Sequence, residues 1–223
     1  MTELQSSTSP NRRFRRRVRQ HLALAVGAGL VVLLGLAGLP GDGRTRLSLS
    51  LAYAAFFALI ATLSLGPLRR FQGRLNPTSF DLRRDLGLWS AILALAHTAV
   101  GLTVHFRGRM TLYFLAPESQ QLPGPIRLDA FGLANHSGLA AALLLAGLAL
   151  ISSDKWLGRL GPTRWKRWQR FALVAAGLTV VHGLAYQLLE ARAIPLILLL
   201  LALGGLGVGL RYLPEVRPRR AGA

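Results

Sequence analysis

Uncharged hydrophobic stretches alternate with short polar segments along the chain. Six such stretches contain no charged side chain and are 18 to 23 residues long: 22–39, 47–68, 86–104, 131–153, 171–189 and 193–210. About 20 helical residues cross the ~30 Å hydrocarbon core of a bilayer, so each stretch is long enough to span it. The pattern predicts an all-α integral membrane protein, a six-transmembrane helix bundle.

The polar connections are too short to form a further domain. The longest, 105–130, has 26 residues, which is too few to bury an independent core without disulfides or a metal. We therefore expect one membrane domain at 22–212, a basic N-terminal segment at 1–21 and a basic tail at 213–223. The first stretch is longer than a signal-peptide core and lacks a clear small-residue cleavage site, which favours a retained span.

Lysine and arginine are distributed unequally between alternate connections. The N-terminal segment has six, 69–84 five, 155–170 six and 211–223 four, whereas the other three connections share six. Because basic residues are retained on the cytoplasmic side, this asymmetry predicts that both termini are cytoplasmic. It also explains the net charge of +18 without nucleic acid, which we do not expect as a partner.

Two histidines lie inside hydrophobic stretches that should run in the same direction. His97 lies 10 residues past Gly87 and His182 lies 11 past Phe171, so at 1.5 Å per residue both are roughly 15 Å deep, near the bilayer midplane. Two imidazoles at equal depth can ligate one haem iron. The alternatives are hydrogen bonding between helices, and proton or ion handling. The absence of cysteine excludes thiolate-bound clusters and covalently attached c-type haem.

The remaining histidines are expected nearer the membrane surfaces. His105 and His136 fall on the outer side, where they could contact haem propionates or ligate a second haem. His21 lies in the basic N-terminal segment and is most simply an interfacial residue.

Several short motifs resemble the ferric reductase-like transmembrane domain. They are Arg-Arg-Asp-Leu-Gly-Leu-Trp at 83–89, Leu-Ala-His at 95–97, Leu-Gly-Pro-Thr-Arg-Trp-Lys-Arg-Trp-Gln-Arg at 160–170 and Val-His-Gly at 181–183. The resemblance covers roughly 77–187. Within that family it is nearest to the MsrQ (YedZ) group, the haem-binding subunits of a periplasmic methionine sulfoxide reductase system.

This resemblance implies b-type haem held by histidines on the third and fifth spans, in an inner and an outer pair about thirteen residues apart. His97 and His182 match the outer pair. Arg84 and Gln169 stand at the inner positions, and neither is a usual haem ligand, so we expect one haem b.

The predicted function is transmembrane electron transfer in a multi-pass protein of the bacterial inner membrane. The 223 residues hold no flavin or nicotinamide domain, so we expect a separate donor, a bound flavin such as FMN, or a quinol, together with an outer redox acceptor. The chain would then be the electron-transfer component of a membrane oxidoreductase. A small membrane transporter or scaffold is the alternative, and only a haem protein would be red when purified.

The connection 155–170 interleaves Trp156, Trp165 and Trp168 with basic residues. It could bind a flavin phosphate or the acidic face of a partner, whereas the simpler interpretation is an aromatic and basic belt at the membrane interface.

Overall fold

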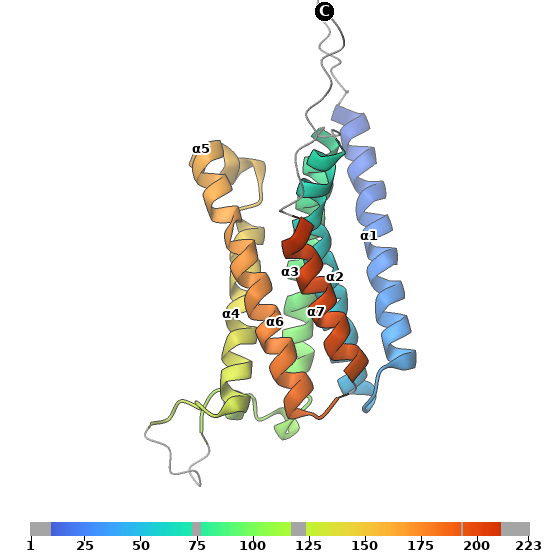
Figure 1. Cartoon of the computed structure of the whole chain (residues 1–223). Coiled ribbons are helices and arrows are strands. Elements are labelled where there is room, and N and C mark those ends of the chain that lie inside the picture. Colours follow the sequence, from blue (N-terminus) through green and yellow to red (C-terminus); the bar gives the residue numbers. More distant parts are fainter. Residues whose placement is uncertain (1–9, 73–76, 117–123, 193, 211–223) are drawn as a thin grey trace, which may run out of the picture.

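The computed structural model describes residues 10–72, 77–116, 124–192 and 194–210, which form an elongated bundle of helices (Figure 1). Its seven α-helices are α1 (Pro10–Gly38), α2 (Gly43–Phe71), α3 (Pro77–Gly101), α4 (Ala130–Leu150), α5 (Asp154–Gln169), α6 (Phe171–Leu189) and α7 (Ile194–Gly209). Two 3₁₀ turns, η1 (Phe106–Gly108) and η2 (Met110–Tyr113), lie between α3 and α4. In the described part of the chain, β pairing is confined to one bridge between Leu115 and Ile126, so the all-α prediction is confirmed.

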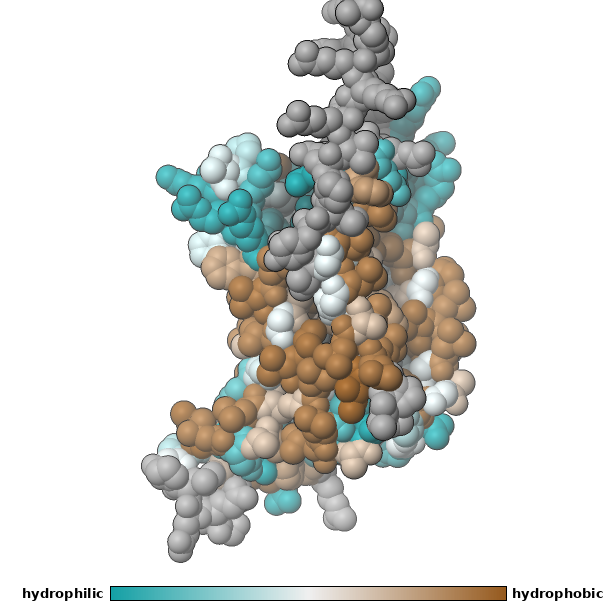
Figure 2. All heavy atoms as spheres, in the orientation of Figure 1, coloured by the Kyte–Doolittle hydropathy of each residue, from teal (hydrophilic) through white to brown (hydrophobic). Residues whose placement is uncertain are grey.

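Four helical stretches are long and apolar enough to cross a membrane: Phe14–Gly38, Gly43–Phe71, Ala130–Leu150 and Asp154–Leu189. A shorter apolar stretch, Ile197–Leu206, lies in α7. On the face seen in Figure 2, hydrophobic residues cover the middle of the bundle and hydrophilic residues lie toward both ends. These features support a multi-pass membrane protein, and the count of six spans stays a prediction.

Successive long helices run in opposite directions (Figure 1). The start of α1, the end of α2, the start of α3 and the whole of α5 lie at the upper end in that view, whereas α1, α3 and α6 end at the lower end. The basic segments that lie within the described residues therefore gather at one end of the bundle, as the alternation of charge requires. That this end faces the cytoplasm remains a prediction, and the predicted tail at 213–223 lies outside the described residues.

Two helices have bounds that differ from those of their hydrophobic stretches, and one polar connection is helical. α1 begins at Pro10, well before the hydrophobic stretch at 22–39, and α3 covers Pro77–Gly101 where 86–104 was expected. The connection 155–170 is largely the helix α5, which has a kink where Gly161 adopts a φ of 72° before Pro162. Ser153 caps its start by accepting a hydrogen bond from the backbone N–H of Trp156, at 3.3 Å.

Tyr113 closes the lower end of α3. Its hydroxyl donates to the carbonyl of Gly101 at 2.9 Å, and it accepts from the backbone N–H of His105 at 2.8 Å. Burial raises the pKa of Tyr113, which keeps the hydroxyl protonated as a donor. These bonds satisfy backbone groups that a longer helix would have used, so residues 102–104 leave the helix.

Buried carboxylates join α1 to the upper part of α3. Asp85 is fully buried and accepts from Arg17 at 2.5 Å and from Gln20 at 2.9 Å, and its Oδ2 lies 3.5 Å from Nε2 of His21. The indole N–H of Trp89 donates to Nδ1 of the same histidine at 3.2 Å. This polar network pairs α1 with α3, which favours helix in the residues before the first and third hydrophobic stretches. His21 thus has a structural role as well as an interfacial position.

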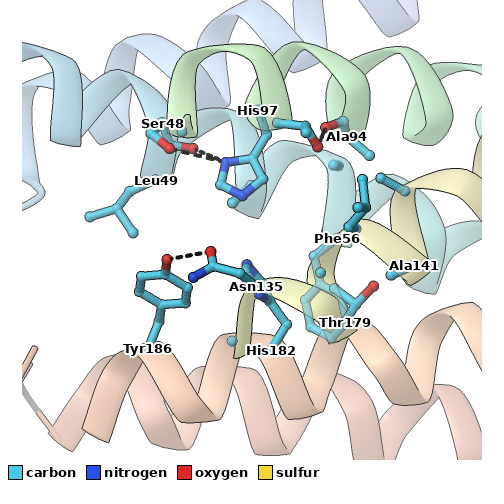
Figure 3. Close-up of a pocket in the computed structure, with 18 of the residues that line it drawn as sticks. Ser48, Leu49, Phe56, Ala94, His97, Asn135, Ala141, Thr179, His182 and Tyr186 are labelled. Atoms are coloured by element: carbon cyan, nitrogen blue, oxygen red, sulfur yellow. Dashed lines mark hydrogen bonds between the residues drawn. The ribbon is translucent and has the colours of Figure 1, made fainter. Parts of the chain in front are cut away.

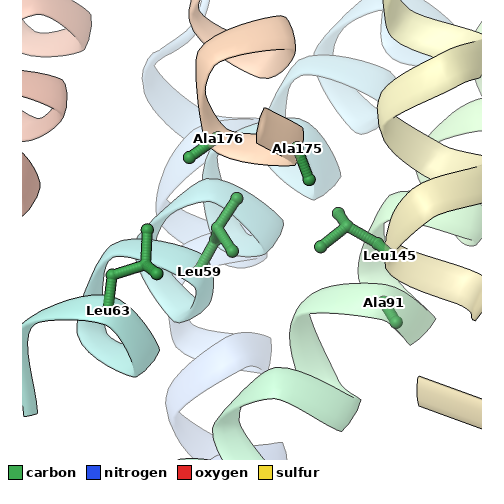
Figure 4. Packing of buried hydrophobic residues seen from close by; sticks show 6 residues of the cluster. All are labelled: Leu59, Leu63, Ala91, Leu145, Ala175 and Ala176. Carbon is green, nitrogen blue, oxygen red and sulfur yellow. The ribbon is translucent and has the colours of Figure 1, made fainter. Parts of the chain in front are cut away.

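Small residues close the upper half of the bundle. Ala91 of α3 and Ala175 and Ala176 of α6 are buried together with leucines of α2 and α4, namely Leu59, Leu63 and Leu145 (Figure 4). Alanines let the four backbones approach closely. α2 packs along α3 and α4 packs along α6, and lower in the bundle these two pairs separate enough to leave a cavity.

Candidate functional site

A cavity of about 160 Å³ lies between α2, α3, α4 and α6 in the lower half of the bundle. Its lining is mainly apolar, with Leu49, Phe56 and Ala141 among the residues labelled in Figure 3. Both central histidines project into it from opposite walls, His97 from α3 and His182 from α6. The sequence prediction that these two side chains come together agrees with their positions in the structure.

The ring of His97 is held by α2. Its Nδ1 lies 2.9 Å from the carbonyl oxygen of Ser48 and 3.1 Å from the hydroxyl oxygen of the same residue. A carbonyl can only accept, so Nδ1 carries the proton, and the lone pair is on Nε2. Gly101 lies one turn further along α3, where a Cβ would be 3.3 Å from Ser48 Oγ and 3.8 Å from the imidazole.

The ring of His182 is held in the same way by α4. Its Nδ1 lies 2.8 Å from the carbonyl oxygen of Ala134, which places the proton on Nδ1 and the lone pair on Nε2. Gly138, one turn further along α4, makes room for the ring, because a Cβ there would be 2.5 Å from Nδ1. The glycine is therefore required by the close approach of the histidine.

The two imidazole centroids are 6.1 Å apart, and the ring planes are inclined by 69°. Two imidazoles that share one iron have centroids roughly 6 Å apart, since each metal–nitrogen bond is about 2.0 Å and each nitrogen lies about 1 Å from its ring centre. Metal-bound histidines usually donate their second N–H to a carbonyl or carboxylate, as both do here. The pair has the spacing and the tautomers of axial ligands.

Two side chains alone do not complete a metal site. Within the described residues, no group of three or more histidine, cysteine, aspartate or glutamate side chains could hold a metal ion. A haem iron brings four porphyrin nitrogens and needs only two axial ligands, which this pair can supply. The residues present fit haem better than a free metal ion.

The depth of the pair in a bilayer stays a prediction. His97 is four residues from the end of α3, and His182 is seven residues from the end of α6.

His105 also lines the cavity, at its lower end. Its Nε2 lies 3.4 Å from a carboxylate oxygen of Glu190, and its ring stacks on Tyr186 with centroids 6.3 Å apart and planes inclined by 19°. The ring of Tyr186 is in turn 5.0 Å from that of His182. His105 is thus connected to the central pair through one aromatic side chain.

His136 does not line the cavity. Its ring lies 5.6 Å from that of Phe114, and its buried Nε2 has no hydrogen-bond partner within the described part of the chain. The structure therefore does not place this histidine in the cavity with His97 and His182.

The side chains at the two inner positions, Arg84 and Gln169, form their contacts outside the cavity. Arg84 pairs with Asp154 at the start of α5, with a nitrogen–oxygen distance of 2.6 Å. Gln169 donates to the hydroxyl of Ser152 at 3.4 Å. Neither side chain lines the cavity, and the apolar cluster of Figure 4 occupies the interior of the upper half.

Sequence reasoning missed several polar residues of the cavity wall. Tyr186 donates to Oδ1 of Asn135 at 2.8 Å, Gln187 donates to the hydroxyl of Tyr53 at 3.1 Å, and Arg192 lines the lower end. A signal was present, because amides inside otherwise hydrophobic stretches are costly in a membrane and usually face the bundle interior.

Similarity to known proteins covers part of the chain. A protein-methionine-sulfoxide reductase haem-binding subunit MsrQ of Rhodospirillum rubrum is 38% identical over 85 residues, 38% of this chain and 39% of the relative. This part of the chain resembles MsrQ. A second MsrQ, of Xanthomonas axonopodis pv. citri, is 33% identical over 124 residues, 56% of this chain and 50% of its own length.

A third relative has a different name. Magnetosome protein MamZ of Magnetospirillum gryphiswaldense is 30% identical over 128 residues, 57% of this chain but 18% of that protein. The matched part of the chain thus spans half or less of each of these relatives. No family model and no solved structure matches the chain.

Proposed function

We propose that this chain is a haem b-binding subunit that transfers electrons across the bacterial inner membrane. The observation that carries the proposal is the pair of His97 and His182, whose rings are 6.1 Å apart and whose Nδ1 atoms both face backbone carbonyls. The similarity to proteins named as haem-binding subunits supports the same cofactor. Bound haem would supply one-electron redox chemistry.

The chain's own residues set the conditions for that chemistry. Ser48 and Ala134 orient the imidazoles, and the apolar walls exclude water and lower the local dielectric constant. One haem per chain is the stoichiometry that we propose, because Arg84 and Gln169 are engaged with other residues and the upper interior is packed.

The direction of transfer that we propose is from the upper to the lower end of the bundle. The upper end carries most of the basic residues and is proposed to be cytoplasmic, with six spans and both termini on that side. A separate donor, such as a flavin reductase or a quinol, would deliver electrons. Toward the lower end, ring contacts run from His182 through Tyr186 to His105, which supports an outer acceptor there.

A spectrum of the purified chain tests this function. The expected result is a red protein with sharp reduced-minus-oxidised bands of low-spin haem b. Colourless protein from haem-replete cells, with no spectral change on adding haem, would contradict the proposal and favour a transporter or scaffold in which the histidines handle protons or join helices.

A further inference from the structure

The end of α6 turns a charged side chain back onto the cavity. Ala191 has a φ of 47°, a left-handed conformation that is strained for a non-glycine residue. The backbone N–H of Arg192 donates to the carbonyl of Gln187 at 2.9 Å, the pattern that closes a helix through a left-handed residue. The turn places Arg192 in the lining of the cavity.

Among the described residues that line the cavity, Arg192 is the one whose side chain carries a permanent charge. Its guanidinium makes no hydrogen bond or ion pair with the other described residues. The nearby carboxylate of Glu190 is already paired with His105, at 3.4 Å. Arg192 is half-buried in the cavity wall, so its guanidinium can donate hydrogen bonds to an anionic group that enters the cavity.

The side-chain amide of Gln187 also has an atom without a hydrogen-bond partner among the described residues. Gln187 is 4% exposed and lines the same cavity, and its Nε2 donates to Tyr53 while the buried Oε1 has no partner within the described residues. A half-turn of the amide lets the Tyr53 hydroxyl donate to Oε1 and leaves the N–H groups of Gln187 available to another acceptor. Those groups can then donate to a carboxylate.

We infer that Arg192, supported by Gln187, binds a carboxylate substituent of the porphyrin and so fixes which way round the haem lies. This inference rests on the proposed function. Guanidinium and carboxylate form charge-assisted, often bidentate hydrogen bonds, which are among the strongest available to a protein. The haem propionates then lie at the lower end of the bundle, on the side of Arg192 and away from α5.

Competition between haem and its dimethyl ester tests the inference. The ester keeps the iron and the ring but has no carboxylate. Full-length protein depleted of haem is titrated with each compound, and binding is followed by the low-spin absorbance. A charge-assisted hydrogen bond contributes about 1.5 to 3 kcal/mol, so wild type should prefer haem to the ester by roughly tenfold or more.

Substitutions identify the residue. Arg192→Gln should abolish the preference, and Arg192→Lys should keep part of it. Arg44→Gln removes an exposed arginine at the same end and should leave the preference unchanged. Equal affinity of wild type for both compounds overturns this inference alone, as does an unchanged preference in Arg192→Gln.

Wild type that binds neither compound contradicts the proposed function, and the inference with it. If Arg192→Gln does not accumulate in the membrane, the ratio of wild-type affinities still decides. The reduction potential gives a second measurement, because loss of a nearby positive charge should lower the potential in Arg192→Gln and leave it unchanged in Arg44→Gln.

Discussion

His97 and His182 lie on helices that belong to different packed pairs, yet their imidazole rings are 6.1 Å apart. Each ring is fixed by the helix that packs against its own, since His97 bonds to Ser48 of α2 and His182 to Ala134 of α4. Both Nδ1 atoms are thereby used, which directs the metal-binding lone pairs away from the supporting helices. Five predictions follow from this arrangement and from its surroundings.

Replacing either central histidine should remove low-spin haem. His97→Ala or His182→Ala leaves an iron with one axial ligand at most, so the low-spin bands should be lost while the protein remains in the membrane. Optical and electron paramagnetic resonance spectra measure this. His136→Ala is the matched control, since that residue lies outside the cavity, and it should retain the bands. Unchanged spectra in both cavity variants would show that the pair does not ligate iron.

Filling the space beside His182 should weaken haem binding. A Cβ at Gly138 would lie 2.5 Å from Nδ1, so Gly138→Ala should displace the ring and lower haem occupancy severalfold. Gly147→Ala lies on the same helix in open space and should have no effect. Haem-to-protein ratios of the two variants, purified side by side, make the comparison. Equal occupancy would mean that the ring is free to move without consequence.

Each chain should contain one haem. Arg84 and Gln169 are bonded to Asp154 and Ser152, and alanines and leucines fill the upper interior. A pyridine haemochrome assay with protein determined by amino-acid analysis should give a ratio near one. A ratio of two would refute this stoichiometry and redirect attention to His105 and His136 as additional ligands.

Charge reversal on α5 should slow electron delivery. Arg164, Lys166 and Arg167 are exposed at the upper end, where a positive surface can guide an acidic donor protein or a phosphorylated cofactor. Changing all three to Glu should slow reduction by a flavin reductase at low salt, with the haem spectrum unchanged. The difference should shrink as ionic strength rises, because exposed charges are screened. Identical rates at low salt with every donor would exclude this face as the entry point.

Loss of the buried carboxylate between α1 and α3 should destabilise the protein. Asp85→Ala removes a fully buried carboxylate and its ion pair with Arg17, whose side chain is 27% exposed, so the cost should fall below the about 3 to 5 kcal/mol typical of a fully buried pair. Asp154→Ala removes the exposed partner of Arg84 and should cost about 1 kcal/mol or less. Thermal unfolding in one detergent should show the larger shift for Asp85→Ala. Equal shifts would mean that α1 is held by its apolar contacts alone.

The sequence by itself determined the helical class and the position of the hydrophobic stretches, and it singled out His97 and His182, whose rings the fold brings together. These follow from local rules, since an uncharged stretch of about 20 residues is costly anywhere but in a bilayer or a core, and a buried imidazole needs a partner. The grouping of basic segments at one end also follows, because short connections force neighbouring spans to alternate in direction.

The tertiary structure alone decided how the histidines are held. Ser48 and Ala134 orient the two rings through their backbone carbonyl oxygens. Because every residue has a backbone carbonyl, the sequence pattern could not predict these hydrogen bonds. The end of α3 depends on Tyr113, twelve residues beyond Gly101, and the placement of Arg192 depends on a left-handed Ala191. Such features arise from contacts between segments distant in sequence and from backbone geometry. The hydrophobic pattern of the sequence gives no information about either of these.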